Sequence, residues 1–326
     1  MEKKTYLKDI PAINFNTVEE SLKGFRNDFS SFFSKLRGEY LKDELTQIFS
    51  YLFKNIKDTI FLDALIREID TLRYKENLDD LLDFLLEFNP DSIKEEDLNS
   101  YINLRVLCLK AISNYKDTKS ITAILYCLNN KNEHYKTRLA AAEALGKIGD
   151  KNAVTSLINV VSDEEEKSIY VRESAAMALG MIGDMRAVDP FLTILEAKKN
   201  FLDKFTFLKE RVIEALGKFN MPHSKRVLSA LKDALLDESP QVRLNTVETL
   251  MNFAIEEEDD FGAAELIKKM LYDEDEEVAR SSVTALYNVL GESILKEILE
   301  EKDIPHHCKE EAQNILETEL LEDENE

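Results

Sequence analysis

The chain has 326 residues, of which 44% are hydrophobic and 33% are charged, a balance typical of a folded protein rather than a disordered one. Its 9 glycines and 6 prolines are too few to punctuate many short strands, so the composition favours helices. The net charge is −22, and residues 251–326 contribute −18 of it (24 acidic and 6 basic side chains), a surface that would repel nucleic-acid phosphates and anionic lipid.

The first hundred residues predict four helices without a visible repeat. Apolar side chains recur at three- and four-residue steps within 18–36, 41–56, 62–72 and 78–85, and Thr17-x-x-Glu20 has the pattern of a capping box. A turn signal at Asn89-Pro90-Asp91 separates this region from the rest of the chain. Ten of the 17 phenylalanines lie in residues 1–100. Residues 1–92 are therefore expected to be either a helical cap with a bulky aromatic core or a separate module with a partner-binding aromatic face.

A repeat of about 34 residues runs through the remainder of the chain. The segments share an apolar stripe at helical spacing, and their last residues are 30 to 37 positions apart. They are LRVLCLKAI (104–112), TRLAAAEAL (137–145), VRESAAMAL (171–179), LKERVIEAL (208–216), VRLNTVETL (242–250), VARSSVTAL (278–286) and, more weakly, CKEEAQNIL (308–316). Seven copies at this period predict a solenoid, in which stacked units bury one another's apolar faces.

Each unit is predicted to contain two helices. Between the repeated segments lie other apolar segments, such as NAVTSLINVV (152–161) and AVDPFLTILEA (187–197). In the 171–184 copy the buried stripe is expected to be Val171, Ala175, Ala178, Leu179 and Ile182. Gly183 follows where a left-handed residue ends a helix, and Asp184 begins the link to the next helix. The phrases LGKIGD (145–150) and LGMIGD (179–184) are thus two copies of one helix end.

These segments resemble the HEAT repeat, in particular the short subclass of phycobilin-lyase-type proteins. The resemblance rests on RLAAAEALGKIGD (138–150) and VRESAAMALGMIGD (171–184), and the other copies keep the stripe without the glycines. It implies an all-α fold, a HEAT-type α-solenoid over residues 93–316, with the helical N-terminal cap before it and an acidic tail at 317–326. The repeat serves binding proteins of many kinds, so the fold alone does not specify a function.

One basic position recurs near the start of each repeated segment. It holds Arg105, Arg138, Arg172, Lys209 and Arg243, whereas Ala279 departs from the pattern. These side chains could form a basic ladder for an acidic ligand. The alternative is structural, because each begins a helix just after an acidic turn, and in similar HEAT proteins this Arg binds an Asp of the preceding turn or neighbouring unit. Repeated spacing favours the structural role.

Motifs for catalysis or cofactor binding are absent from the sequence. It contains no phosphate-binding loop, dinucleotide fingerprint, nucleophile elbow or paired-histidine zinc helix. His306-His307-Cys308 is the only cluster of metal-ligand types, and adjacent helical residues point about 100° apart. Iron-dependent deoxyhypusine hydroxylases, another HEAT-repeat class, use His-Glu dipeptides, and no histidine here precedes a glutamate. The sequence predicts no cofactor, no metal and no catalytic residue.

The candidate binding surface follows from the buried stripe. In HEAT-like stacks the second helix of each unit lines the concave side, so its outward residues form the floor of a groove. The expected partner-binding residues are Glu143, Glu173, Met177, Met181, Glu210, Glu214 and Glu248. Methionine side chains adapt to a bound helix or extended peptide. These positions could instead be ordinary solvent-facing ones whose charges support their own helices.

The sequence therefore predicts a non-enzymatic interaction scaffold that binds a protein partner in the groove. The acidic C-terminal quarter would attract a basic segment of that partner. The alternative is an accessory lyase or chaperone of the phycobilin-lyase type, acting on a chromophore-bearing protein. Three scattered cysteines argue against a disulfide framework, and no apolar stretch has the length of a membrane span. We expect a cytoplasmic protein that binds neither nucleic acid nor membrane.

Overall fold

A computed structural model describes residues 13–26, 28–87, 93–196, 206–219, 224–256 and 262–323, with side chains described as far as residue 318. Every regular element in these ranges is a helix, and no strand occurs in them, which confirms the predicted all-α solenoid class. The chain divides into two compact units, residues 1–148 and 149–326. Each unit is described by itself below.

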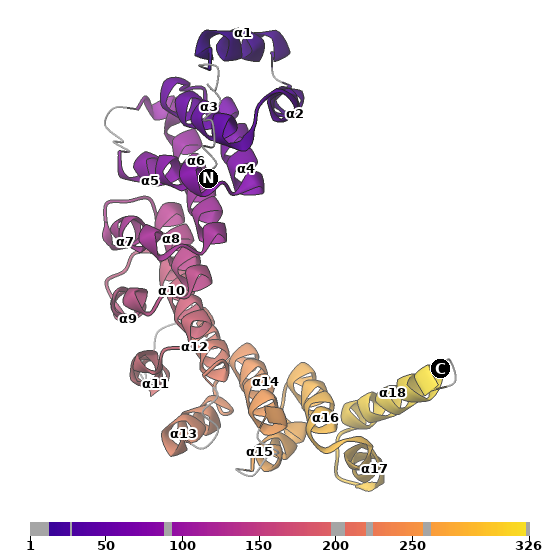
Figure 1. The fold of residues 1–326 in the computed structure, drawn as a ribbon. Coiled ribbons are helices and arrows are strands. Elements are labelled where there is room, and N and C mark those ends of the chain that lie inside the picture. Colours follow the sequence, from indigo (N-terminus) through magenta and orange to yellow (C-terminus); the bar gives the residue numbers. More distant parts are fainter. Residues whose placement is uncertain are drawn as a thin grey trace, which may run out of the picture. The chain divides into compact units, whose positions relative to one another are not determined.

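Within the described ranges, unit 1 contains eight α-helices, which Figure 1 labels α1 to α8. They are α1 (Phe15–Phe25), α2 (Phe29–Glu39), α3 (Lys42–Asn55), α4 (Thr59–Leu72), α5 (Leu78–Leu86), α6 (Glu95–Tyr115), α7 (Ile121–Asn129) and α8 (Tyr135–Ile148). Helices α4, α6 and α8 pack in a row, and α5 and α7 form a second row against them. The predicted turn at 89–91 lies outside the described residues.

The aromatic side chains near the start of unit 1 form a core. Phe32, Phe33, Phe49 and Phe61 are buried, with ring centroids 5.3 to 6.3 Å apart. Helix α4 packs directly against α6, the helix of the first repeated segment. These four rings are buried and do not form an exposed face.

Two details of the N-terminal helices differ from the sequence-based expectation. The cap residue of α1 is Asn14, whose side chain accepts a hydrogen bond from the Thr17 backbone N–H at 3.4 Å, so Thr17 is not the N-cap. The apolar stripe from 18 to 36 belongs to two helices, because the chain turns at Arg26, where φ is 53°. Helical periodicity continues across such a turn, so it could not show the break.

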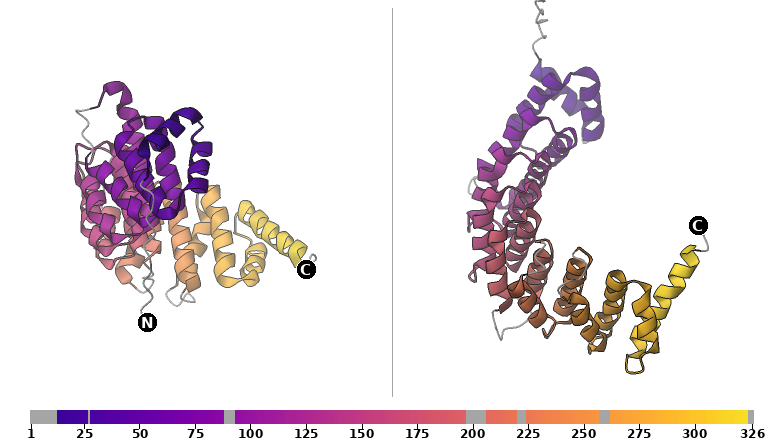
Figure 2. Two further views of the ribbon diagram at one scale, coloured as in Figure 1. Left: turned by 45° about the horizontal axis from the view of Figure 1, so that its top comes forward. Right: turned by 60° about the horizontal axis from the view of Figure 1, so that its bottom comes forward.

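Unit 2 contains ten α-helices within the described ranges. They are α9 (Val154–Ser162), α10 (Ile169–Ile182), α11 (Val188–Glu196), α12 (Thr206–Gly217), α13 (Lys225–Ala234), α14 (Pro240–Glu256), α15 (Ala263–Lys269), α16 (Glu276–Leu290), α17 (Glu292–Glu300) and α18 (His306–Asp323). Helices α10, α12, α14, α16 and α18 pack in succession, and each also packs on the shorter helix before it. The additional views show this succession of paired helices (Figure 2).

The buried face of α10 explains why the repeated segment is rich in alanine. Val171, Ala175, Ala178 and Leu179 are buried as predicted, whereas Ile182, the last residue of the helix, is only partly buried. Ala176 and Gly180 are buried too, so the helix is covered over a wider arc than one stripe. Small side chains on this arc let both α9 and α12 pack closely against α10. None of the described helices is both long and apolar enough to cross a membrane.

Helix α10 ends as the repeated phrase predicts. Gly183 adopts φ 67° and its N–H donates to the Leu179 carbonyl at 3.0 Å. The Asp184 carboxylate then accepts from the Arg186 backbone N–H at 3.0 Å and starts the next turn. Gly149 has φ 79°, and the Asp150 side chain makes the matching contact with the Asn152 N–H at 2.7 Å. The phrase therefore encodes a left-handed helix end followed by an aspartate cap.

Lys116 occupies the position of these glycines at the end of α6 and adopts the same left-handed conformation, with φ 51°. A side chain costs about 1 kcal/mol there, so Lys116→Gly is expected to raise the free energy of unfolding by up to that amount. Denaturant unfolding measures the change. Gly183→Ala is the matched control and should lower it by about 1 kcal/mol. A loss of stability in Lys116→Gly would contradict the assignment.

Candidate functional site

The recurring basic residues lie inside the stack. Arg105, Arg138, Arg172 and Arg243 are at most 5% exposed. Three of these arginines and Lys309, at the same repeat position, donate to a carbonyl at the end of the preceding helix. The bonds are Arg105 Nη1 to Leu85 (2.7 Å), Arg138 Nε to Leu128 (2.9 Å), Arg172 Nε to Val161 (2.9 Å) and Lys309 Nζ to Leu299 (3.4 Å). Helix ends leave such carbonyls without helical partners.

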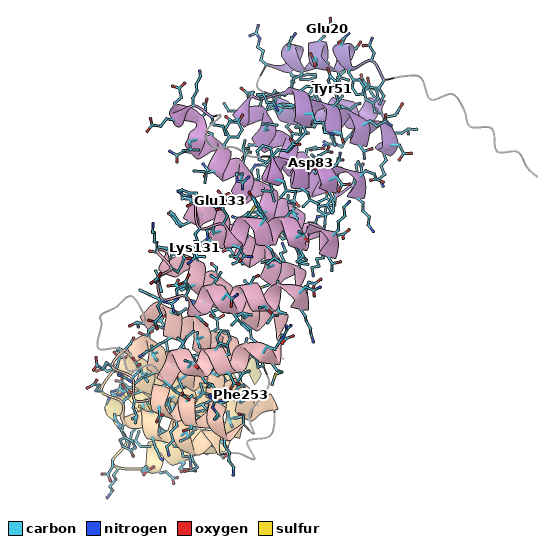
Figure 3. The ribbon with its side chains drawn as sticks, turned by 90° about the vertical axis from the view of Figure 1, so that its left-hand side faces the viewer. Glu20, Tyr51, Asp83, Lys131, Glu133 and Phe253 are labelled. Atoms are coloured by element: carbon cyan, nitrogen blue, oxygen red, sulfur yellow. The ribbon has the colours of Figure 1, made fainter. Side chains whose placement is uncertain are left out.

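Three residues at the basic position bind an acidic residue in the turn of the following repeat. Arg105 Nη2 lies 2.6 Å from Glu133, which Figure 3 labels between α7 and α8. Lys209 Nζ lies 2.5 Å from Asp237. Arg243 binds both carboxylate oxygens of Asp273, through Nε at 2.8 Å and Nη2 at 2.7 Å. These contacts confirm the structural role, and a basic ladder open to a ligand is wrong for the buried arginines.

Arg172→Ala is expected to lower the free energy of unfolding by about 1–3 kcal/mol, because the buried Val161 carbonyl loses its side-chain donor. Burial lowers the pKa of the Arg172 guanidinium, against neighbouring acidic residues that raise it. Thermal unfolding measures the effect, while the affinity for a partner protein should stay unchanged. An unchanged melting temperature together with lost binding would reverse the assignment.

The predicted partner-binding residues do not share one environment. Glu143 on α8 in unit 1 and Glu248 on α14 in unit 2 are exposed. On α10, Met181 is 53% exposed and Met177 is partly buried. On α12, Glu214 is partly exposed and bound to Arg211 (2.7 Å) and Lys218 (3.3 Å), the local pairing that the alternative interpretation describes. As a group these residues remain a proposal for a binding surface.

Glu210 differs from the expectation of an outward side chain. It is only 3% exposed, and its Oε1 is buried without a hydrogen-bond partner among the described residues. Glu173, at the same repeat position on α10, is partly buried and its Oε1 is likewise unpartnered there. Periodicity within one helix could not reveal this, because the neighbouring unit covers the position.

Glu173 acts electrostatically on the carboxyl group of Glu210. Burial raises the pKa of Glu210, Arg211 lowers it, and the neighbouring Glu173 raises it further. Burial also raises the pKa of Glu173, with Arg211 again opposing the shift. The hydrogen bond that Arg211 makes among the described residues goes from Nη1 to Glu214, at 2.7 Å, and not to Glu173 or Glu210. Two acidic side chains therefore meet between α10 and α12 without a cation bonded to both.

Two exposed aromatic residues on α10 and α12 were not among the predicted partner-binding residues. Tyr170 on α10 and Phe207 on α12 are 59% and 57% exposed. Both stand nine residues before the end of their repeated segments, one helical turn before Glu173 and Glu210. Large exposed aromatic side chains at one repeat position were visible in the aligned copies. We call the set Tyr170, Glu173, Met177, Met181, Phe207 and Glu210 the α10–α12 face.

The acidic cluster at 273–277 is used partly within the protein. Asp273 is bound to Arg243, and both side chains are almost fully buried. The Asp275 carboxylate accepts from the backbone N–H groups of Glu277 (3.0 Å) and Val278 (3.2 Å) and caps α16. Within the acidic C-terminal quarter, residues 257–261 and 324–326 lie outside the described residues. The acidic surface available to a partner is therefore smaller than the net charge suggests.

The described structure also contains a histidine–cysteine cluster and a cleft outside this face. No group of three or more His, Cys, Asp or Glu side chains in it could hold a metal ion. His306 Nδ1 lies 3.1 Å from Glu310, and Cys308 is buried. A cleft of about 360 Å³ lies between α15 and α17, lined by residues that include Tyr272, Ile294 and Ile298. It belongs to the row of shorter helices and does not include the α10–α12 face.

Comparison with solved structures finds helical-repeat proteins. The complex of CpcE and CpcF of phycocyanin lyase from Nostoc sp. PCC7120 is 20% identical, with a TM-score of 0.41, and the match covers 71% of this chain and 94% of that chain. Human deoxyhypusine hydroxylase is 16% identical, with a TM-score of 0.31, over 79% of this chain and 96% of that chain. The karyopherin Kap121p bound to the SUMO protease Ulp1p is 12% identical, with a TM-score of 0.49, over 92% of this chain and 41% of that chain.

Comparison with curated proteins finds no match. A family model for HEAT repeats matches residues 97–169, 121–204 and 200–287. The matches together span residues 97–287, more than half of the chain, and they include the repeated segments whose helix ends and buried arginines are described above. The chain belongs to the HEAT-repeat family.

Proposed function

We propose that this chain is a non-enzymatic interaction scaffold that holds a segment of a partner protein on the α10–α12 face. The observation that supports the proposal is the exposure of Tyr170, Met181 and Phe207, each more than half exposed, on two helices that pack side by side. Clustered exposed apolar side chains rimmed by charge are typical of protein-binding surfaces. Aromatic and methionine side chains are enriched at such surfaces, and methionine adapts to its partner.

The test compares three tagged proteins purified from the native cell: the unchanged chain, a Met181→Arg/Phe207→Arg variant, and a Leu236→Arg control. Leu236 is 80% exposed but lies at the end of α13, in the row of shorter helices. We expect one protein to be retained stoichiometrically by the unchanged chain and the control and lost from the double variant. Quantitative mass spectrometry measures retention, and circular dichroism checks the fold. Equal retention by all three would place binding elsewhere.

We further propose that the acidic C-terminal quarter accelerates association with a basic partner segment. Glu274, 89% exposed at its side chain, and the exposed Glu297 and Glu310 contribute to this surface. If the attraction acts over distance, the association rate should fall steeply as salt rises from 0.05 to ~0.5 M. An association rate that does not change with salt would remove this part of the proposal.

The accessory-lyase alternative has a separate test. Co-expression with a bilin and a chromophore-bearing protein should leave this chain colourless if it is a scaffold only. A chromophore that absorbs and copurifies with the chain, or is transferred only in its presence, would favour the lyase or chaperone alternative.

A further inference from the structure

The repeat position of Glu173 and Glu210 can be compared along the chain. The repeats on either side carry Leu139 and Leu244 at this position, and both side chains are partly buried. Leucine suits a position that a neighbouring helix covers. Two consecutive repeats of unit 2 therefore carry an acidic residue at a covered position where the flanking repeats carry leucine. An unpaired carboxylate at such a position is costly. This substitution lacks a reason within the described stack.

The last two repeat copies show what charges at this position can do. There the position holds Arg280 on α16 and Glu310 on α18, and Arg280 Nη2 lies 2.9 Å from Glu310 Oε2. Arg280 Nη1 also lies 3.6 Å from Glu311. Side chains at this position on consecutive helices thus come within reach of one guanidinium. At α10 and α12 the same repeat position carries two carboxylates, and the nearby Arg211 guanidinium is hydrogen-bonded to Glu214.

We propose that Glu173 and Glu210 together bind one arginine side chain of the partner segment. The proposal deepens the proposed function and rests on it. Glu210 is 97% buried and its Oε1 has no hydrogen-bond partner among the described residues, so a cation is the group that satisfies it. A guanidinium has five donors in a planar fork and can bind both carboxylates at once, whereas an ammonium is a single, strongly hydrated charge.

The surroundings suit an arginine. Tyr170 and Phe207, one helical turn away on each helix, offer exposed rings on which a guanidinium or its aliphatic stem can stack. Met177 stands one turn beyond Glu173 and can cover the other side. Arg211 and Lys218 stay bound to Glu214, so the chain's own cations near this face on α12 are already engaged.

The first measurement is the stability of the protein without partner. Glu173→Leu/Glu210→Leu introduces the residues of the flanking units, and we expect a higher melting temperature than that of the unchanged chain. A catalytic or docking residue commonly lowers stability in this way, whereas a structural residue stabilises the fold. A lower melting temperature in both this variant and Glu173→Gln/Glu210→Gln would show that the carboxylates are structural and would overturn the proposal.

The second measurement uses N-acetylarginine methylamide as the probe, detected through the ¹³C-methyl signals of Met177 and Met181 in the full chain. We expect a saturable shift with this probe and none with the neutral isostere N-acetylcitrulline methylamide. Affinity should fall at least tenfold in Glu173→Gln/Glu210→Gln. The matched control Glu96→Gln removes a carboxylate on α6 whose side chain is 75% exposed, and it should keep the affinity within twofold.

Each outcome bears on one proposal at a time. Absence of probe binding, while Met181→Arg/Phe207→Arg still loses the native partner, would overturn the arginine site and leave the scaffold function standing. If the probe binds but Met181→Arg/Phe207→Arg retains the native partner, the scaffold function on this face would be overturned and the arginine site would stand. Equal affinity for N-acetyllysine methylamide would show that the site takes any cation, and the assignment to arginine would be wrong.

Discussion

Arg243→Ala is expected to lower the free energy of unfolding by about 3–5 kcal/mol, the largest effect of a single substitution proposed for this chain. The Arg243 guanidinium binds Asp273 through two nitrogens and donates through Nη1 to the Asp237 carbonyl at 2.8 Å. Both charged side chains are at most 6% exposed. Removing Arg243 leaves the Asp273 carboxylate buried without its counter-ion. Denaturant unfolding measures the loss.

A double substitution separates the buried charge from the packing. Arg243→Met/Asp273→Leu removes both charges, and it should cost less than Arg243→Ala alone, because no unpaired charge remains. Arg243→Lys should fall between the two, since an ammonium cannot form both bonds with the carboxylate. If Arg243→Ala cost less than about 1 kcal/mol, the pair would contribute no more than an exposed salt bridge.

Gly180→Val is expected to lower the free energy of unfolding by about 3 kcal/mol. A Cβ atom at Gly180 would lie 2.9 Å from the Ala215 Cβ and 3.0 Å from its Cα, closer than two carbon atoms can pack. Helices α10 and α12 touch at this point almost backbone to backbone. A branched side chain must push α12 away, and the contacts on both sides of Gly180 are then lost. Thermal unfolding measures the change.

Gly217 provides the matched control, because it occupies the same repeat position on α12. A Cβ there would meet Thr249 at 3.4 Å, an ordinary contact, so Gly217→Ala should leave stability unchanged or raise it slightly. Gly180→Ala should still destabilise, since even one methyl group overlaps Ala215. Equal effects of the two alanine substitutions would mean that backbone freedom, not helix spacing, determines the requirement for glycine.

Much of the fold could be predicted because the same local residue patterns recur in successive repeats. Gly149 and Gly183 adopt a left-handed conformation, and Asp150 and Asp184 cap the following turn. Each Gly-Asp pair lies within its own phrase of six residues. The structural role of the basic position was also predictable, because packing between stacked repeats requires the same residue type at the same position of each repeat. Lys116 shows the limit of the rule, since it adopts the glycine conformation without being glycine.

The candidate site was harder to predict because exposure in a stack depends on the neighbouring unit. The stripe within α12 places Glu210 opposite the buried residues, yet the side chain is covered. Helix α12 packs on α11 and also on α10 and α14, so its buried arc is wider than an isolated amphipathic pattern indicates. The exposure of Tyr170 and Phe207, by contrast, could have been found by comparing one position between copies.

The departure at Ala279 bears on how the protein opens under stress. In a repeat protein, unfolding proceeds through units held by nearest-neighbour coupling, and the weakest junction opens first. Lys209 and Arg243 bind an acidic residue in the turn of the next repeat, whereas the methyl group of Ala279 cannot. The ion pairs from α16 to α18 are instead those of the partly exposed Arg280 with Glu310 and Glu311. Backbone amides of α17 and α18 should therefore exchange hydrogen before those of α12 and α14. The C-terminal end of unit 2 can then fray and re-form while the α10–α12 face stays folded.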